Sequence, residues 1–445
     1  MRNKWVYIAV LLMLSTTDAA AKLFEISEFF LPNRMRVLVV ENHKAPIAKH
    51  MVWYGVGSAD EKPGKGGSAH LLEHLMFRGT KAVPDKEFNA LMQKNGIESN
   101  AFTYFDYTAY HQSLDVSRLE LVMYLEADRM QNLHFSPEAF AAERDIVLQE
   151  RKQVIENKPT SVLVENMLRV LWQTHPYGRP ITGTEDEIRN LTAADVTELY
   201  KQYYSPENAV LVVSGDVNPK QVYNLALKYY GAVANKAKTP AHTYPELNLS
   251  ARSNLTMQLP RSQTERLSLF YTAPSYNRPD GQNIYALDVL AQYLGGGETS
   301  YLYKKLVLQQ KIAVAVGVDY TYAARSYGSL ILQAVPAADK DAKSLQTALT
   351  EALQEAIRRF DEAELTKIKQ KMLAGLVYVR DNPDDAAQIV GTLATIGMSA
   401  AEIADYADNI AAVTLQDVQR AAKNLLTEQA SAIGMALPQK GGRNE

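Results

Sequence analysis

Residues 68–77 read Ser68-Ala69-His70-Leu71-Leu72-Glu73-His74-Leu75-Met76-Phe77, a stretch that predicts a short helix. At about 100° per residue, His70, Glu73 and His74 share one face of that helix, and the leucines lie elsewhere. We expect Ser68 to cap its start and Gly79, just beyond the stretch, to close it. Two imidazoles one turn apart can bind one zinc ion, and Glu73 beside them can act as a general base. The alternative is a solvated helix face that carries these residues by chance.

A third metal ligand is expected from a long helix predicted over Pro137–Glu156. Glu143 and Glu150 recur there with two valines on one stripe of the helix surface. A carboxylate that faces a core is costly unless it is paired or bound to metal. Both acids are therefore better candidates for a site than Glu138, although either could lie at a helix edge where its carboxylate reaches water.

The elements around these two helices predict the fold class. Strands rich in valine and aromatic residues are expected at Met35–Val40, Lys49–Val56 and Ala209–Ser214, with two more inside Glu98–Leu114. Amphipathic helices are expected at Lys86–Asn95, Ser117–Gln131 and Pro137–Glu156. Because the strands are paired locally and separated from runs of helices, we predict an α+β fold with helices packed on one face of a mostly antiparallel sheet.

The length of 445 residues favours two domains, because single cores stop growing near ~250–300 residues. Residues 236–252 lose periodicity and carry prolines, which is typical of a linker between a first domain at 22–235 and a second at 253–440. Two helix starts also repeat, because Leu191–Val196 and Val413–Val418 share the pattern Thr-x-x-Asp and each leads to a strand. A duplication would make the domains related, although this pattern is also ordinary capping chemistry.

Composition excludes several classes of function. Charged residues make up 22% of the chain and the formal net charge is −3, with no basic block of the kind that nucleic acid or an anionic membrane requires. The chain has no cysteine, which excludes disulfides, a thiol nucleophile and cysteine metal ligands. Neither a phosphate-binding G-x-x-x-x-G-K-[ST] loop nor the G-x-S-x-G motif of serine hydrolases occurs.

The N-terminal residues are typical of an export signal. Arg2 and Lys4 precede the apolar run Trp5–Leu14, and the small residues Ala19–Ala21 offer a cleavage site. A membrane anchor is the alternative, but this run is much shorter than the ~20 residues that cross a bilayer core. We therefore predict a signal peptide over residues 1–21 and, in a bacterium, a periplasmic protein that is not inserted in the membrane.

The spacing of the histidine and glutamate motifs resembles a known family. His70-x-x-Glu73-His74, with Glu150 seventy-six positions beyond His74, is similar to the site of the inverted-zincin metallopeptidases, which include pitrilysin and the mitochondrial processing peptidase. The similarity extends through Phe77-Arg78-Gly79-Thr80, Asn100-Ala101-Phe102-Thr103, Thr108-Ala109-Tyr110, His175-Pro176-Tyr177-Gly178 and Tyr204-Ser205-Pro206-Glu207-Asn208. The resemblance implies that His70, His74 and Glu150 bind one zinc ion per chain. It implies further that Glu73 is the catalytic base and that Glu143 supports the site.

The resemblance also implies an architecture and a way of binding substrate. The expected architecture is a pair of related α+β domains that form half of a clamshell, which closes around an extended peptide. The implied substrate-binding residues are Phe77 and, on an edge strand to which the peptide adds as a further strand, Asn100, Ala101 and Phe102. The implied function is that of an exported zinc-dependent endopeptidase. The alternative is a catalytically inactive binding or assembly subunit of the same fold.

Two positions in the second domain depart from the family pattern. Where the family has an arginine and a tyrosine that hold the substrate across the chamber from the zinc, this sequence has Tyr301 and Val314. Because the family's small members have about half the length of its large single-chain enzymes, a related second subunit can supply the missing pair. We therefore hypothesise a heterodimer in which this chain is the zinc-bearing catalytic subunit. A homodimer is the simpler alternative.

Overall fold

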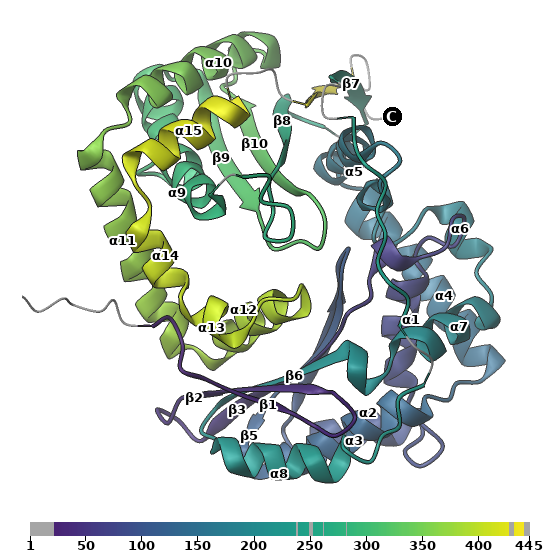
Figure 1. Ribbon diagram of the computed structural model, residues 1–445. Coiled ribbons are helices and arrows are strands. Elements are labelled where there is room, and N and C mark those ends of the chain that lie inside the picture. The colour runs from purple at the N-terminus through teal and green to yellow at the C-terminus, as the bar shows by residue number, and fades with distance from the viewer. Residues whose placement is uncertain are drawn as a thin grey trace, which may run out of the picture.

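The computed structural model of the chain describes residues 22–236, 239–248, 252–260, 262–281, 283–426 and 431–439. The signal peptide predicted over residues 1–21 therefore lies outside the described residues. Figure 1 shows two β-sheets, each with helices packed against it. The predicted α+β fold with two related domains is confirmed. No helix among the described residues is both long enough and apolar enough to span a bilayer.

The first domain contains a six-stranded sheet in the order β1-β2-β6-β3-β5-β4. Its strands are β1 (Ile26–Phe30), β2 (Arg36–Glu41), β3 (Ile47–Tyr54), β4 (Glu98–Thr103), β5 (Thr108–Asp115) and β6 (Ala209–Gly215). β2 and β6 are parallel, and every other neighbouring pair is antiparallel. β4 is therefore an edge strand that pairs with β5 on one side only.

The second domain contains a five-stranded sheet in the order β7-β11-β8-β10-β9. Its strands are β7 (Ser253–Leu259), β8 (Arg266–Ala273), β9 (Ala313–Thr321), β10 (Gly328–Pro336) and β11 (Ala432–Pro438). β7 and β11 are parallel, and the other neighbours are antiparallel. In order and direction, β7, β11, β8, β10 and β9 repeat β2, β6, β3, β5 and β4 of the first sheet.

The helices before the last strand of each sheet carry the repeated Thr-x-x-Asp pattern. The side chain of Thr192 and that of Asp195 accept each other's backbone N–H at the start of α7. Thr414 and Asp417 do the same at the start of α15. Together with the shared strand order, these matching capping boxes support a duplication of one domain.

Helices make up the rest of both domains. The first domain has α1 (Ser68–Leu75), α2 (Asp85–Lys94), α3 (Leu119–Asn132), α4 (Pro137–Arg151), α5 (Pro159–Trp172), α6 (Glu185–Arg189), α7 (Ala193–Tyr203) and α8 (Pro219–Tyr229). The second has α9 (Ile284–Gly295), α10 (Ala342–Arg359), α11 (Glu362–Asp381), α12 (Pro383–Thr395), α13 (Ala400–Ala404), α14 (Tyr406–Ala412) and α15 (Leu415–Leu426). The long helix expected to end at Glu156 is α4, which continues as one π-helical segment, Lys152–Glu156. The domain limits at 22–235 and 253–440 and the linker at 236–252 stay predictions.

Each sheet is covered on both faces, and each domain lends one helix to the other. Val37 and Val39 face a core shared with α1 and α3, whereas Leu38 and Trp53 face α12 of the second domain. Figure 1 shows α12 lying over the sheet of the first domain. In the second domain α9, α10 and α15 cover one face of the sheet, and α5 of the first domain covers the other. Gly391 permits the close approach of α12, because a Cβ there would lie 2.0 Å from Nε1 of Trp53. The sequence had indicated helices on only one face.

Candidate metal centre

A glycine caps the start of α1, and a glutamate from the preceding loop anchors it. Gly67 has a φ of 85°, and a Cβ on it would lie 2.4 Å from the carbonyl oxygen of Thr182. The carboxylate of Glu61 accepts the backbone N–H of Gly67 at 3.0 Å and that of Ala69 at 2.8 Å. Ser68 is the first residue of the helix, with no side-chain cap bond at its start, so the predicted Ser68 cap is wrong. A side chain from the preceding loop performs that function instead.

Three potential metal ligands converge from α1 and α4. His70 and His74 lie one turn apart on α1, and Glu150 lies in the last turn of α4. One donor atom from each residue lies within 4.8 Å of the others. Nε2 of His74 is 3.3 Å and Nε2 of His70 is 3.7 Å from Oε2 of Glu150. Two imidazole nitrogens and one carboxylate oxygen are a donor set that fits a catalytic zinc ion, which keeps a fourth position open.

Glu143 lies behind this group and orients it. Its Oε2 accepts a hydrogen bond from Nδ1 of His74 at 2.9 Å, and its Oε1 accepts one from Nε of Arg78 at 2.7 Å. Because Nδ1 of His74 donates to Glu143, Nε2 is the nitrogen that faces Glu150 and that a metal would take once its proton is lost. Burial raises the pKa of Glu143, but its hydrogen bonds to His74 and Arg78 outweigh burial and hold that pKa below its usual value.

The pKa values of the two histidines shift in opposite directions. Burial and the neighbouring His74 lower the pKa of His70 to about 4, so its imidazole is neutral. Burial also lowers the pKa of His74, but hydrogen bonds to Glu143 and Glu150 raise it to about 9. A cation that binds here would therefore displace one proton from His74, which makes its affinity depend on pH.

Glu73 shares the helix face of the histidines and has no part in the three-residue group. Its side chain is buried, and its Oε2 accepts a hydrogen bond from the hydroxyl of Thr103 at 2.6 Å. Burial raises the pKa of Glu73 to about 7, a value suited to proton transfer near neutral pH. Thr103 is the last residue of β4, so the edge strand and this carboxylate are directly connected.

The four residues expected to bind substrate lie near the same edge. Asn100, Ala101 and Phe102 belong to β4, where Asn100 is exposed and the other two are half-buried. Ala101 packs towards the core that contains α1, whereas Phe102 packs towards Trp53 on the other face of the sheet. The centre of the Phe77 ring lies 5.3 Å from the guanidinium carbon of the buried Arg129. The structure thus brings these residues to the edge strand and the end of α1, and their role in binding stays a prediction.

Sequence reasoning missed three residues of the site. Thr103 and Arg78 lie inside the stretches that resemble the family, and Arg78 follows His74 by one helical turn, so spacing alone could have marked it. Glu61 had no such signal, because a loop side chain that caps a helix six to eight residues later matches no local capping pattern.

The chain is similar to known proteins over most of its length. A model described as "Insulinase (Peptidase family M16)" matches residues 36–185, and one described as "Peptidase M16 inactive domain" matches residues 190–372. The zinc protease PqqE of Helicobacter pylori is 29% identical over 362 residues, which cover 80% of each chain. A probable mitochondrial-processing peptidase subunit beta of Arabidopsis thaliana is 24% identical over 419 residues, 92% of this chain and 77% of that protein. The crystal structure of a protease from Helicobacter pylori covers 93% of this chain and 100% of its own, with a TM-score of 0.87 and 26% identity.

Proposed function

This chain belongs to peptidase family M16, and from that premise we propose that it is an exported zinc-dependent endopeptidase. Its substrates would be peptides or unfolded segments that fit a closed chamber. The observation that carries the proposal is the convergence of His70, His74 and Glu150 within 4.8 Å, with a buried acid beside them. Relatives named zinc proteases cover most of the chain.

In this proposal His70, His74 and Glu150 hold the zinc ion, and Glu143 keeps His74 in the tautomer that can bind. Zinc, when bound, supplies Lewis acidity that activates a water molecule and polarises the peptide carbonyl. Glu73 takes a proton from the attacking water and delivers it to the leaving amine. The hydroxyl of Thr103, 2.6 Å from Oε2 of Glu73, holds the carboxylate in place for both transfers.

The peptide adds to β4 in the same proposal. β4 has one edge without a strand partner, so its backbone N–H and C=O groups can pair with an extended peptide whatever its sequence. Asn100, Ala101 and Phe102 lie on that strand, and Thr103 at its end contacts Glu73. The scissile bond and the base would therefore be positioned by one strand. Phe77, near the end of α1, would contact a substrate side chain.

We propose further that the chain works as the catalytic subunit of a dimer. Tyr301 packs against Tyr293 within the second domain, and Val314 is exposed on the edge strand β9. Val314 has no side-chain hydrogen-bond donor and Tyr301 has no positive charge, so a related subunit would supply the arginine and tyrosine. Co-purification at native expression level tests this. A second protein of similar mass whose removal abolishes hydrolysis supports a heterodimer, whereas full activity of the isolated chain contradicts it.

Export is the remaining part of the proposal and rests on the N-terminal residues. Fractionation of the expressing bacterium tests it, with mass spectrometry of the mature N-terminus. A periplasmic protein that begins near Lys22 is expected. A cytoplasmic protein that retains Met1 or Arg2 would contradict export and leave the zinc assignment intact.

Two substitutions test the chemistry. Glu73→Gln should keep one zinc per chain and lose hydrolysis of an unstructured peptide, because only the base is removed. His70→Ala should lose both the metal and hydrolysis. Wild-type turnover in Glu73→Gln would overturn the mechanism. A wild-type protein that binds zinc but hydrolyses nothing, alone or with its co-purifying partner, would instead identify an inactive binding or assembly subunit.

A further inference from the structure

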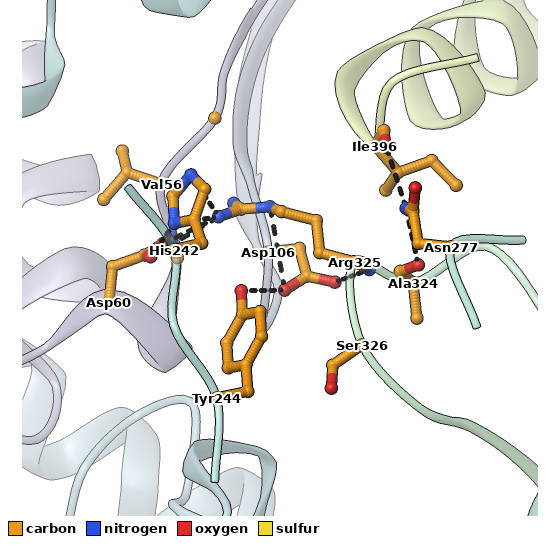
Figure 2. Close-up of polar contacts among 12 residues, drawn as sticks. Val56, Asp60, Asp106, His242, Tyr244, Asn277, Ala324, Arg325, Ser326 and Ile396 are labelled. Atoms are coloured by element: carbon orange, nitrogen blue, oxygen red, sulfur yellow. Dashed lines mark hydrogen bonds and ion pairs between the residues drawn. The ribbon is translucent and has the colours of Figure 1, made fainter. Parts of the chain in front are cut away.

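A buried arginine of the second domain reaches the turn that ends β4 in the first domain. Arg325 lies between β9 and β10, and only 9% of its side chain is exposed. Its Nη1 lies 3.4 Å from Oδ1 of Asp60, and its Nε lies 3.8 Å from Oδ1 of Asp106 (Figure 2). The two aspartates are 4% and 3% exposed. Arg325 therefore places a positive charge between two buried carboxylates of the other domain.

The backbone of Arg325 makes a second connection to the same turn. Its N–H donates to Oδ2 of Asp106 at 2.9 Å, and the hydroxyl of Tyr177 donates to the same oxygen at 2.6 Å. His242, from the segment between the two sheets, lies with Nδ1 2.7 Å from Oδ1 of Asp60 and 2.6 Å from Nη1 of Arg325. Figure 2 shows Asp60, Asp106 and His242 around the side chain of Arg325. Asp106 is thus fixed by both main-chain and side-chain groups.

Asp60 and Asp106 also belong to two segments that are bound to each other through their backbones. Ser58 N–H donates to the carbonyl of Tyr104 at 3.0 Å, and Ala59 N–H donates to that of Phe105 at 2.9 Å. Gly57 permits this approach, since a Cβ on it would lie 2.2 Å from the carbonyl oxygen of Tyr104. Residues 57–60 and 104–106 therefore behave as one unit, and Arg325 contacts a carboxylate from each.

We propose that Arg325 is a positioning residue for peptide binding, and this inference rests on the proposed function. Its single positive charge offsets part of the negative charge of Asp60 and Asp106, and its contacts to both fix the turn that follows Thr103. Because β4 pairs with a strand on one side only, that turn sets how straight and how ordered the free edge is. Backbone pairing to the edge is formed in the bound peptide and in the transition state alike. Disturbing it therefore raises KM. The fall in kcat is much smaller, because α1 still holds Glu73 beside His70 and His74 when its hydrogen bond to Thr103 is weakened.

Arg325→Gln tests the inference by steady-state kinetics with an unstructured peptide. KM should rise about tenfold or more, with kcat within about threefold of wild type and zinc still bound. Arg325→Lys keeps the charge, so its KM should lie between that of the wild type and that of Arg325→Gln. The matched control is Arg278→Gln, because Arg278 is also a second-domain arginine but pairs with Glu246, its Nη2 2.8 Å from Oε2. KM of the control should equal that of wild type.

Hydrogen–deuterium exchange gives a readout that needs no activity. Amides of residues 98–108 should exchange faster in Arg325→Gln than in the wild type, while the rest of the first domain keeps its protection. In Arg278→Gln the exchange rates of these amides should equal those of the wild type. A uniform rise in exchange would show simple destabilisation and would overturn the inference. If the wild type hydrolyses peptide, an Arg325→Gln variant with the KM of the wild type would also overturn it. If the wild type hydrolyses nothing, the proposed function fails and the exchange pattern alone decides the inference. If Arg325→Gln does not fold, Arg325→Lys takes its place in both measurements.

Discussion

Glu143→Gln isolates the contribution of the carboxylate that lies behind the candidate metal ligands. The side chain of Glu143 is 8% exposed and uses both oxygens, one towards His74 and one towards Arg78. Glutamine has the same shape but only one acceptor, so its amide N–H₂ must face one of these two donors. Arg78 can only donate, whereas His74 can change its tautomer. We therefore expect the amide oxygen to face Arg78 and the N–H₂ group to face Nδ1 of His74.

This orientation of the amide moves the proton of His74 from Nδ1 to Nε2, the nitrogen that would bind the metal. With Nδ1 accepting from the amide, Nε2 carries the hydrogen, although Nε2 is the atom 3.3 Å from Glu150. Zinc must then bind against an unfavourable tautomer and without the nearby negative charge. Loss of such a supporting partner costs about 10–100-fold in metal affinity. This corresponds to about 1.4–2.7 kcal/mol of binding free energy.

Zinc affinity is measured by titration of the purified protein against a chromophoric chelator at constant pH. The control is Glu138→Gln, because Glu138 is an exposed acid in the first turn of the same helix, α4. Its substitution removes the same charge from the helix without touching His74, so its zinc Kd should match wild type. A Glu143→Gln protein whose zinc Kd stays within about twofold of wild type would refute the reasoning, because the tautomer of His74 would then not depend on Glu143.

Two predictions concern stability. His50 is fully buried between Gln112 and a tyrosine hydroxyl, and burial lowers its pKa to about 4. Between about pH 6.5 and pH 4 the unfolded chain binds a proton that the native chain does not, so the free energy of unfolding falls as the pH drops, by up to about 3 kcal/mol from this residue. Urea titrations at several pH values should show a weaker pH dependence in His50→Gln, and an unchanged one would contradict the assignment. Gly391→Ala should lower the free energy of unfolding by about 1–3 kcal/mol, because its Cβ would overlap Trp53. Gly375→Ala on α11, where nothing lies within 4 Å of the new Cβ, should instead raise it by up to about 1 kcal/mol, and equal effects would contradict the packing argument.

The sequence predicted the local part of the candidate metal site, because the spacing of its residues follows the period of an α-helix. His70 and His74 share a face at a spacing of four, and Glu143 and Glu150 lie on one stripe of α4 at a spacing of seven. Both relations depend only on helical geometry, and the structure brings all four side chains together. The strand and helix positions were likewise close, because alternation and amphipathicity are local properties.

The parts that could not be predicted depend on contacts between distant segments. The pattern of an amphipathic helix shows that one of its faces is buried but not which sheet that face contacts. The packing of α5 on the second sheet and of α12 on the first could therefore not be predicted from the sequence. Arg325 is a single arginine between two strands, and nothing near it in the sequence marks it as buried. Its burial follows from Asp60 and Asp106, which lie more than two hundred positions earlier.

The exchange of helices limits how a chamber could open. Separating the domains would expose Trp53, which is fully buried under α12, and would leave Asp60 and Asp106 without their arginine. Removing the partner of a buried charge alone costs about 3–5 kcal/mol, comparable to a large share of a domain's stability. The two domains of this chain should therefore move as one body. In the proposed peptidase, the motion that admits a peptide must then occur between this chain and its partner subunit, which is also where the missing arginine and tyrosine would enter.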